Sequence, residues 1–301
     1  MNPEYHIPVL LEAAVAGLEL KAGGRYVDVT FGGGGHSREI LRRLEGGELI
    51  AFDRDPDAKE NLWSDERLTF VPEDFQFLET ALQARSLAPV DGILADLGIS
   101  SHQIDTPERG FSFRFDAPLD MRMNPNQAFS ARTLLNDYEE EEIAQVLHRF
   151  GEVPAARKAA RAIVEARQSR GLETTSDLEL ALQKAMPHQR QAKYLAQVYQ
   201  ALRIAVNGEL ESLAKLLVSA LPVLKPGGRL VIISYHSLED RMVKRFVRSG
   251  NFTGKDEKDF YGNSLSPWQL ITRKAIMPTE AEIERNPRAR SARLRIAEKK
   301  Q

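Results

Sequence analysis

Cysteine is absent from this sequence of 301 residues. Without a thiol there can be no disulfide bond, no thiolate metal site, no iron–sulfur cluster and no cysteine nucleophile. Histidine is scarce as well: its six copies are scattered, and none shows the spacing of paired metal ligands such as HxxxH. We therefore expect no resident metal ion.

Long apolar runs are missing too. No stretch approaches the roughly 18 apolar residues that indicate a membrane span. Residues 1–6 form neither a basic region nor an apolar signal segment. There are no internal repeats and no low-complexity segments. These absences predict a cytoplasmic protein without membrane contact.

The chain has enough apolar material for a packed core. Hydrophobic residues make up 42% of the sequence, and the length allows one large domain or a core domain with an insertion. The net charge of −2 argues against a general nucleic-acid coat, yet residues 237–301 hold 15 lysines and arginines against 9 aspartates and glutamates. This basic part suggests a local contact with a polyanion, the alternative being a solvated surface without a partner.

One stretch organises the rest of the chain. Residues 26–31 read as a buried strand, and four consecutive glycines, residues 32–35, follow it directly. Glycine accepts backbone angles that other residues resist and lets a ligand approach the main chain. A helix is expected from Ser37 onward, with Ile40, Leu41 and Leu44 on one face. Strand, glycine turn and helix N-terminus together favour a nucleotide-cofactor cradle.

A second signal follows at a suitable distance. Asp53 ends a short apolar strand, residues 48–52, and lies 21 residues after Gly32, where nucleotide-binding units place an acid that binds ribose hydroxyls. Phe75 follows a third strand, residues 67–71, and is placed to touch an adenine. The alternative for the glycine turn is that it only packs a helix on the sheet, with Asp53 starting a turn. The alternative for Phe75 is that its ring only covers the core.

A fourth predicted strand, residues 90–98, contains Asp96 near its end, and a long loop follows. In this loop Phe111, Phe113 and Phe115 alternate with polar and basic residues. Loops of this length are usually functional, and aromatic rings beside arginine suit an unpaired base. The same alternation would also let a strand anchor the loop to the core.

The pattern from residue 130 onward is helical and free of strands, which predicts a helical insertion over about residues 106–200. A long helix is expected over residues 199–221, a tight turn over residues 224–228, and a fifth, central and parallel strand over residues 229–235. Ser237 and Asp240 fit a capping box that opens the next helix. Residues 269–272 and 292–297 are expected to form a final antiparallel pair.

Eight ordered blocks carry a family resemblance. They begin at the following residues: His6, Thr30, Asp53, Asp96, Glu108, Leu119, His236 and Asn286. The series, which includes Asp96-Leu97-Gly98-Ile99-Ser100-Ser101, closely resembles the bacterial small-subunit (16S) ribosomal RNA cytosine-N4 methyltransferase family over nearly the whole chain. The resemblance implies an α/β, Rossmann-like class I methyltransferase fold with a seven-stranded, mostly parallel sheet, an antiparallel last strand and an inserted all-helical domain.

The same resemblance implies a domain division, a cofactor and a substrate. Residues 1–105 and 201–301 would bind S-adenosylmethionine, and residues 106–200 would form a substrate-binding helical domain. The cofactor positions implied by the resemblance are Gly34, Gly35, His36, Asp53, Phe75, Asp96 and Gln103. The implied target is a decoding-centre cytosine, in naked small-subunit RNA or in the assembled subunit, and no DNA partner is expected. The oligomeric state stays open, with a homodimer as one option.

This sequence departs from the family pattern at one position. Tyr235 stands where phenylalanine is commoner, which keeps the aromatic ring. Residues 251–267 match no pattern of the family or of a known motif.

Transfer of a methyl group to an exocyclic amine needs alignment and an acceptor for the amine hydrogen, because the cytosine N4 lone pair is delocalised. Asp96 is the first candidate acceptor, although it could serve the cofactor alone. His236 is the second, as a general base, although it could instead make a helix-entry hydrogen bond beside Ser237. Methylation at cytosine C5 usually requires a thiolate, so the absence of cysteine favours amine methylation.

Candidate substrate contacts combine aromatic rings with arginines that could bind phosphates. They are Arg109, Phe111, Phe113, Arg122, Arg245, Arg288 and Arg290, with further basic residues at Lys244, Arg248, Arg293 and Arg295. Two rival functions would use a similar cradle: a nicotinamide-dependent oxidoreductase and a non-catalytic RNA-binding or assembly factor. The first would leave the block that begins at Asp96 unexplained.

Overall fold

The computed structural model describes residues 8–301, so that His6 and Ile7 of the first block lie outside the described residues. The chain divides into two compact units: one contains the described residues up to Gly98 together with Leu210–Gln301, and the other is Ile99–Glu209. The predicted insertion, residues 106–200, lies inside the second unit. No helix in the described part of the chain is both long and apolar enough to cross a membrane.

The first unit is built on a seven-stranded sheet with the order β3-β2-β1-β4-β5-β7-β6. The strands are β1 (Arg25–Asp28), β2 (Glu48–Phe52), β3 (Leu68–Val71), β4 (Val90–Asp96), β5 (Leu224–Ser234), β6 (Trp268–Leu270) and β7 (Arg293–Lys299). β1 to β5 pair in parallel, and β7 is antiparallel to both β5 and β6. The predicted mostly parallel sheet with an antiparallel last strand is confirmed.

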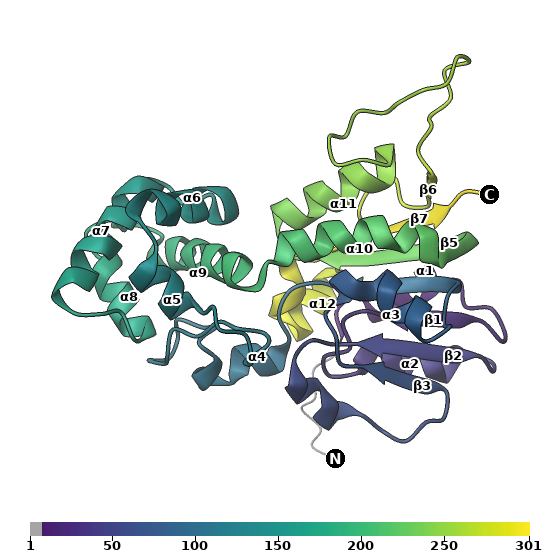
Figure 1. Cartoon of the computed structure of the whole chain (residues 1–301), viewed down its shortest axis with the longest axis horizontal. Coiled ribbons are helices and arrows are strands. Elements are labelled where there is room, and N and C mark those ends of the chain that lie inside the picture. Colours follow the sequence, from purple (N-terminus) through teal and green to yellow (C-terminus); the bar gives the residue numbers. More distant parts are fainter. Residues whose placement is uncertain (1–7) are drawn as a thin grey trace. The chain divides into compact units, whose positions relative to one another are not determined.

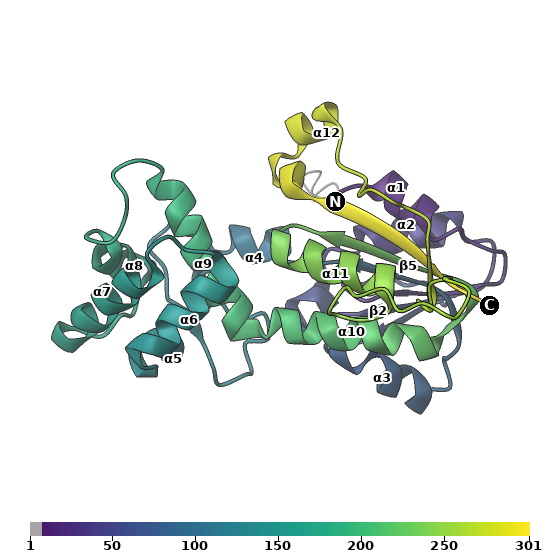
Figure 2. The ribbon, with the colours of Figure 1, turned by 90° about the horizontal axis from the view of Figure 1, so that it is seen from above.

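Helices cover both faces of this sheet (Figures 1 and 2). One face packs against α3 (Leu78–Ala84), α10 (Glu209–Val223) and α11 (Ser237–Ser249), and the other against α1 (Leu11–Gly17) and α2 (Gly35–Arg43). In β5, Leu230 and Ile232 belong to the first core, whereas Val231 and Ile233 belong to the second. Successive side chains point to opposite faces, so a strand covered on both sides must be apolar throughout.

Short elements complete the first unit. They are η1 (Pro56–Asn61), η2 (Phe75–Phe77), α12 (Glu280–Arg285) and η4 (Pro287–Ser291). Near the start of the described chain, the backbone N–H of Leu10 donates to Glu282 Oε1 of α12 at 2.7 Å. This hydrogen bond ties two segments that are 272 residues apart in the sequence.

The second unit is helical. Its elements are α4 (Ser101–Asp105), η3 (Pro107–Arg109), α5 (Ala131–Asp137), α6 (Glu140–Gly151), α7 (Ala156–Ser169), α8 (Thr175–Leu182) and α9 (Gln191–Asn207). Its core contains Leu134, Ile143, Leu147, Ile163 and Leu202, all fully buried. The apolar spacing on these helices therefore serves packing.

Three local predictions were wrong. The helix expected over residues 199–221 is two helices, α9 and α10, because Gly208 adopts a left-handed φ of 57° between them. The capping box of α11 uses His236 and Glu239 instead of Ser237 and Asp240. The third correction concerns residues 224–228, expected as a turn, which belong to β5 and lie beside a register shift at Val90 and Gly92.

Candidate functional site

Acidic side chains stand at or just after the carboxyl ends of neighbouring parallel strands. Asp28 ends β1, Asp96 ends β4, and Asp53 and Asp74 follow β2 and β3. The strand order turns back between β1 and β4, because β2 and β3 lie on one side of β1 and β5 lies beyond β4. In open α/β sheets this switch point is where ligands bind.

The glycine turn is shaped by its protein neighbours. Gly34 is the N-cap of α2 with φ of 73°, and a Cβ atom there would lie 2.9 Å from Trp63. A Cβ atom on Gly35 would lie only 2.2 Å from Cγ of Pro8. A side chain at either glycine would therefore clash with its protein neighbours. The tight turn leads directly into the N-terminus of α2.

Asp53 holds this turn against β2. Its Oδ2 accepts the backbone N–H of Gly32 at 2.7 Å, and its Oδ1 accepts the N–H of Asp55 at 2.8 Å. Burial raises the pKa of Asp53 to about 6, and the two backbone hydrogen bonds oppose that rise. Each oxygen retains a lone pair, so the carboxylate can still accept hydrogen bonds from a ligand.

Asp96 receives a hydroxyl hydrogen bond from the end of β5. Tyr235 donates its hydroxyl to Asp96 Oδ1 at 2.8 Å, and Nδ1 of His36 lies 3.7 Å from Oδ2. The side chain of Asp96 is 22% exposed, so one part of the carboxylate remains accessible. Burial raises its pKa to about 6, while His36 and the Tyr235 hydrogen bond act in the opposite direction.

The surroundings of Asp96 hold it in place. Its backbone N–H donates to the Thr30 hydroxyl at 2.7 Å, which connects β4 to the residue after β1. His36 is buried, and its Nε2 lies 3.2 Å from the carbonyl oxygen of Val9. A carbonyl can only accept, so Nε2 carries a hydrogen in this contact. Burial, together with the neighbouring Asp96 carboxylate, raises the pKa of Tyr235 well above its ordinary value, which keeps the hydroxyl a donor.

Asp28 is a site residue that sequence reasoning missed. It is almost fully buried, and its Oδ2 accepts the Ser37 hydroxyl at 2.6 Å while Oδ1 accepts the N–H of Thr30 at 3.1 Å. Burial raises its pKa, and these hydrogen bonds oppose the rise. The available signal was positional: Asp28 ends the first strand just as Asp96 ends the fourth.

His236 is held by the entry of α11. Its Nδ1 accepts the backbone N–H of Glu239 at 3.4 Å, and its Nε2 lies 3.2 Å from Glu239 Oε1. The Glu239 carboxylate also accepts the N–H of Tyr235 at 3.0 Å. The helix-entry role that sequence analysis left open for His236 is therefore present, with Glu239 as the partner. Glu239 also positions the backbone of the tyrosine that contacts Asp96.

Two further predicted cofactor residues have defined surroundings. Phe75, in η2, is half-buried and packs against the core beneath α3 and α10. The preceding Asp74 accepts a hydrogen bond from Arg54 at 2.8 Å, which fixes this strand end. Gln103 belongs to the second unit, where it is 5% exposed and its Oε1 accepts the N–H of Ser100 in a capping box.

The predicted substrate residues of the second unit shape its loop. The Arg109 guanidinium donates to the carbonyls of Arg122 and Met123, both at 3.0 Å. Arg122 forms a two-point ion pair with Asp120, and Phe111 is buried. Phe113 is half-buried and packs edge-to-face on Tyr199, with ring centroids 5.3 Å apart.

The basic candidates of the first unit fall into two groups. Arg245, Arg288 and Arg290 are exposed. Arg293 and Arg295, by contrast, both bind the carboxylate of Asp240, at 3.0 and 2.7 Å. The ion pairs of the second group are part of the packing between α11 and β7, so the first group is better suited to phosphate contacts.

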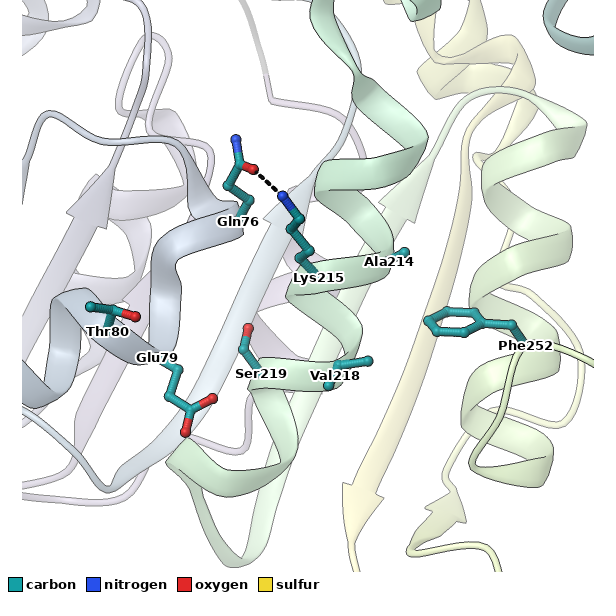
Figure 3. A pocket seen from close by; sticks show the side chains of 8 residues that line it. All are labelled: Gln76, Glu79, Thr80, Ala214, Lys215, Val218, Ser219 and Phe252. Atoms are coloured by element: carbon teal, nitrogen blue, oxygen red, sulfur yellow. Dashed lines mark hydrogen bonds between the residues drawn. The ribbon is translucent and has the colours of Figure 1, made fainter.

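A shallow pocket lies elsewhere in the first unit. It has a volume of about 370 Å³ and is lined by residues of η2, α3 and α10 together with Phe252. Figure 3 shows the hydrogen bond from Lys215 to Gln76, at 2.7 Å, among these side chains. None of the predicted cofactor residues lines this pocket.

Comparisons with known proteins show the family of this chain. A family model described as the MraW methylase family matches residues 4–300. The chain is 53% identical to a protein named ribosomal RNA small subunit methyltransferase H from Bacteroides thetaiotaomicron, over 98% of both chains. Proteins of the same name from Flavobacterium johnsoniae and Cytophaga hutchinsonii are 54% and 53% identical, over 98% of this chain and 98% and 99% of theirs.

Proposed function

The chain belongs to the MraW methylase family, and from this premise we propose that it transfers a methyl group from S-adenosylmethionine to small-subunit (16S) ribosomal RNA. The acceptor is the exocyclic N4 amine of a decoding-centre cytosine. The observation that supports this substrate most strongly is the identity of more than 50% to named small-subunit RNA methyltransferases over 98% of both chains. Such a substrate places the reaction in the cytoplasm.

The strand-end residues fit the chemistry of this cofactor. We assign the ribose hydroxyls to Asp53, whose two oxygens still have free lone pairs, and the adenine to the half-buried ring of Phe75. The first amides of α2, at Gly35 and His36, suit a carboxylate because a helix N-terminus carries partial positive charge. Gly34 shapes this turn, and Gln103 keeps the cofactor-binding role that the family resemblance implies.

The bound cofactor supplies a methyl group that is already activated by the positive charge on its sulfur. Asp96 accepts a hydrogen of the cytosine amine and stabilises the positive charge that develops on N4. With a pKa of about 6, this carboxylate is mostly ionised at neutral pH and can accept. The hydrogen bond from Tyr235 engages Oδ1, so we assign the substrate to Oδ2, which lies 3.7 Å from Nδ1 of His36. His236 takes a secondary role because α11 holds its ring.

The RNA contacts come from exposed cations and from the helical unit. Arg245, Arg288 and Arg290 bind phosphates, since they are exposed. In the second unit, Arg109 and Arg122 hold the loop in shape, and this loop offers the half-buried ring of Phe113, whereas the buried ring of Phe111 packs inside the unit. A base that reacts at N4 must leave its stack, at a cost of a few kcal/mol that such contacts can offset.

Mass spectrometry of ribosomal RNA tests the proposal. Purified protein and S-adenosylmethionine are incubated with small subunits, and separately with naked 16S RNA, from cells that lack the enzyme. We expect a single new methyl group on N4 of one cytosine. RNA from cells that contain the enzyme serves as the control and should gain none. A protein that binds S-adenosylmethionine but methylates neither substrate would contradict the proposal.

A further inference from the structure

Residues 251–267 form a long excursion between α11 and β6, and we call this segment the finger. Figure 1 shows it extending away from both elements. It contains the two most exposed large aromatic side chains in the described part of the chain: Phe260 is 97% exposed and Tyr261 is 86% exposed. Neither ring contributes to the cores of the first unit.

The tip of the finger is a closed, hydrogen-bonded turn. The Oδ1 atom of Asp259 accepts the backbone N–H of Tyr261 at 2.8 Å and that of Asn263 at 2.9 Å. Its Oδ2 accepts the side-chain amide of Asn263 at 3.0 Å, and Gly262 completes the turn with φ of 85°. Because the backbone of the tip is held, the two rings are presented in a defined arrangement, edge-to-face with centroids 5.5 Å apart.

The base of the finger is anchored on α11. The ring of Phe252 packs on Phe246 of this helix at 4.9 Å between centroids. Asn251 Oδ1 accepts the N–H of Gly254 at 3.0 Å and the hydroxyl of Thr253 at 2.7 Å. The finger is therefore continuous with α11, in packing as well as in sequence.

The outer side of α11 is strongly basic. Lys244, Arg245 and Arg248 are exposed and share one side of the helix, because residues three and four apart are neighbours on a helix surface. Among the described residues, none forms an ion pair with these three cations. Lys255 and Lys258 continue the exposed positive charge onto the finger.

The finger carries three acids, Asp256, Glu257 and Asp259, against the five cations of α11 and the finger named above, so this set as a whole stays positive. Asp256 is hydrogen-bonded to the Ser264 hydroxyl at 2.5 Å, and Asp259 is committed to the turn. Glu257 is the exposed acid of the segment. A row of cations therefore leads along α11 to a pair of open aromatic rings.

We propose that the tip of the finger stacks on unpaired bases of the RNA substrate while Lys244, Arg245 and Arg248 hold the adjoining phosphates. This inference rests on the proposed function, since it names how the RNA of that reaction is bound. Open aromatic rings next to a basic surface are the features by which proteins bind single-stranded nucleic acid. An apolar protein partner would not need the row of cations.

Equilibrium binding of unmethylated, naked 16S RNA across a salt series tests the inference. We expect the double variant F260S/Y261S to bind this RNA about 10-fold or more weakly, because each base–ring stack contributes substantially to affinity. Its salt dependence should stay unchanged, since stacking releases no counterions. By contrast, the variant K244Q/R248Q should flatten the salt dependence, with a slope smaller by about 1 to 1.5.

Matched variants separate stacking from other effects. F260Y/Y261F keeps both rings and should bind RNA like the parent protein. Phe77, which is 51% exposed in η2, provides the control F77S, which should also leave RNA affinity unchanged. Calorimetry with S-adenosylmethionine should give the same affinity for all of these variants and would reveal any misfolding.

Two results would overturn the inference. One is unchanged affinity of F260S/Y261S for naked RNA together with unchanged methylation. The other is unchanged affinity for naked RNA with weaker binding to assembled subunits, which would assign the tip to a ribosomal protein. Binding is measured without turnover, so either result is distinct from a failure of the parent protein to methylate RNA.

Discussion

At the scale of single residues, Asp53 and Asp96 lower the stability of the protein at neutral pH. Burial raises the pKa of each from an ordinary value of 3.8 to about 6. Between these values the folded chain binds more protons than the unfolded chain, so the contribution of each group to stability falls as the pH rises from about 4 to about 6. Carboxylates that are destabilising without a ligand are typical of binding sites, where a cationic or hydrogen-bonding ligand compensates.

Asp53→Ala should weaken binding of S-adenosylmethionine by about 10-fold or more and leave RNA affinity nearly unchanged. The substitution removes the acceptor assigned to the ribose and releases the backbone N–H of Gly32. Isothermal titration calorimetry for the cofactor and a filter-binding assay for RNA measure the two affinities. Asp65→Asn, before the amino end of β3, is the matched control. Equal losses in both assays would contradict the ribose assignment.

Methyl transfer should decline as the pH falls through about 6, because protonated Asp96 can no longer accept from the amine. Tyr235→Phe removes the hydroxyl that stabilises the ionised carboxylate. The pKa of Asp96 should then rise, and the acidic limb of the pH–rate profile should move to higher pH. Single-turnover rates from pH 5 to 8 measure both profiles. If the acidic limbs of the two pH–rate profiles coincide, ionisation of Asp96 does not determine how the rate falls at low pH.

At the scale of elements, α11 is tied to β7 by charge. Asp240 is 6% exposed and binds both Arg293 and Arg295. Burial alone would raise its pKa, but the hydrogen bonds from the two arginines hold the pKa below its ordinary value. The stabilisation is therefore present above the unfolded pKa and is lost as the pH falls through the folded one. The same ion pairs keep β7 in register beside β5.

Asp240→Ala should lower the free energy of unfolding by about 3 kcal/mol, because it leaves the 11% exposed Arg295 buried without its partner. Urea denaturation monitored by circular dichroism measures the change. The control Glu141→Gln affects an exposed pair with Arg157 at 3.8 Å and should change stability by less than about 0.5 kcal/mol. If Asp240→Ala loses no more stability than the control, the ion pairs between α11 and β7 do not stabilise the fold as we expect.

At the scale of the whole molecule, positive charge is concentrated in the C-terminal part of an otherwise acidic chain. Residues 237–301 include α11, the finger and η4, which together carry the exposed cations considered above. A localised cationic surface directs a polyanion to one region and leaves the rest of the surface repulsive. This distribution suits an enzyme that engages RNA through a limited set of phosphates.

Replacing Arg288 and Arg290 with glutamine should reduce RNA affinity about 10-fold near 0.1 M salt and lower the salt slope by about 1 to 1.5, because two phosphate contacts are lost. The measurement is RNA binding between 50 and 300 mM salt. The control K21Q/R42Q removes two exposed cations near the amino ends of the strands and should leave the slope unchanged. An unaltered slope for the η4 variant would remove this segment from the RNA interface.

Periodicity and turn chemistry in the sequence predicted the individual strands and the helical unit, because strand and helix periods are local properties. The mostly parallel, Rossmann-like arrangement of the sheet was implied by the family resemblance. Asp53 and Asp96 were predictable as site candidates since each ends or follows an apolar strand. The split at Gly208 was not, because Leu202, Val206 and Leu213 continue one apolar spacing across it. The backbone angle of a single glycine, fixed by packing, decided the outcome.

The sequence by itself determined the family, the fold class and the strand ends that carry the chemistry. Ordered motifs and apolar periodicity depend only on residues that are close together in the sequence. Only the tertiary structure decided which partner each polar group has. Tyr235 and Asp96 are 139 residues apart yet share a hydrogen bond, and Asp240 takes the arginines that sequence reasoning offered to phosphates. Such pairings depend on distance in space, which sequence separation does not encode.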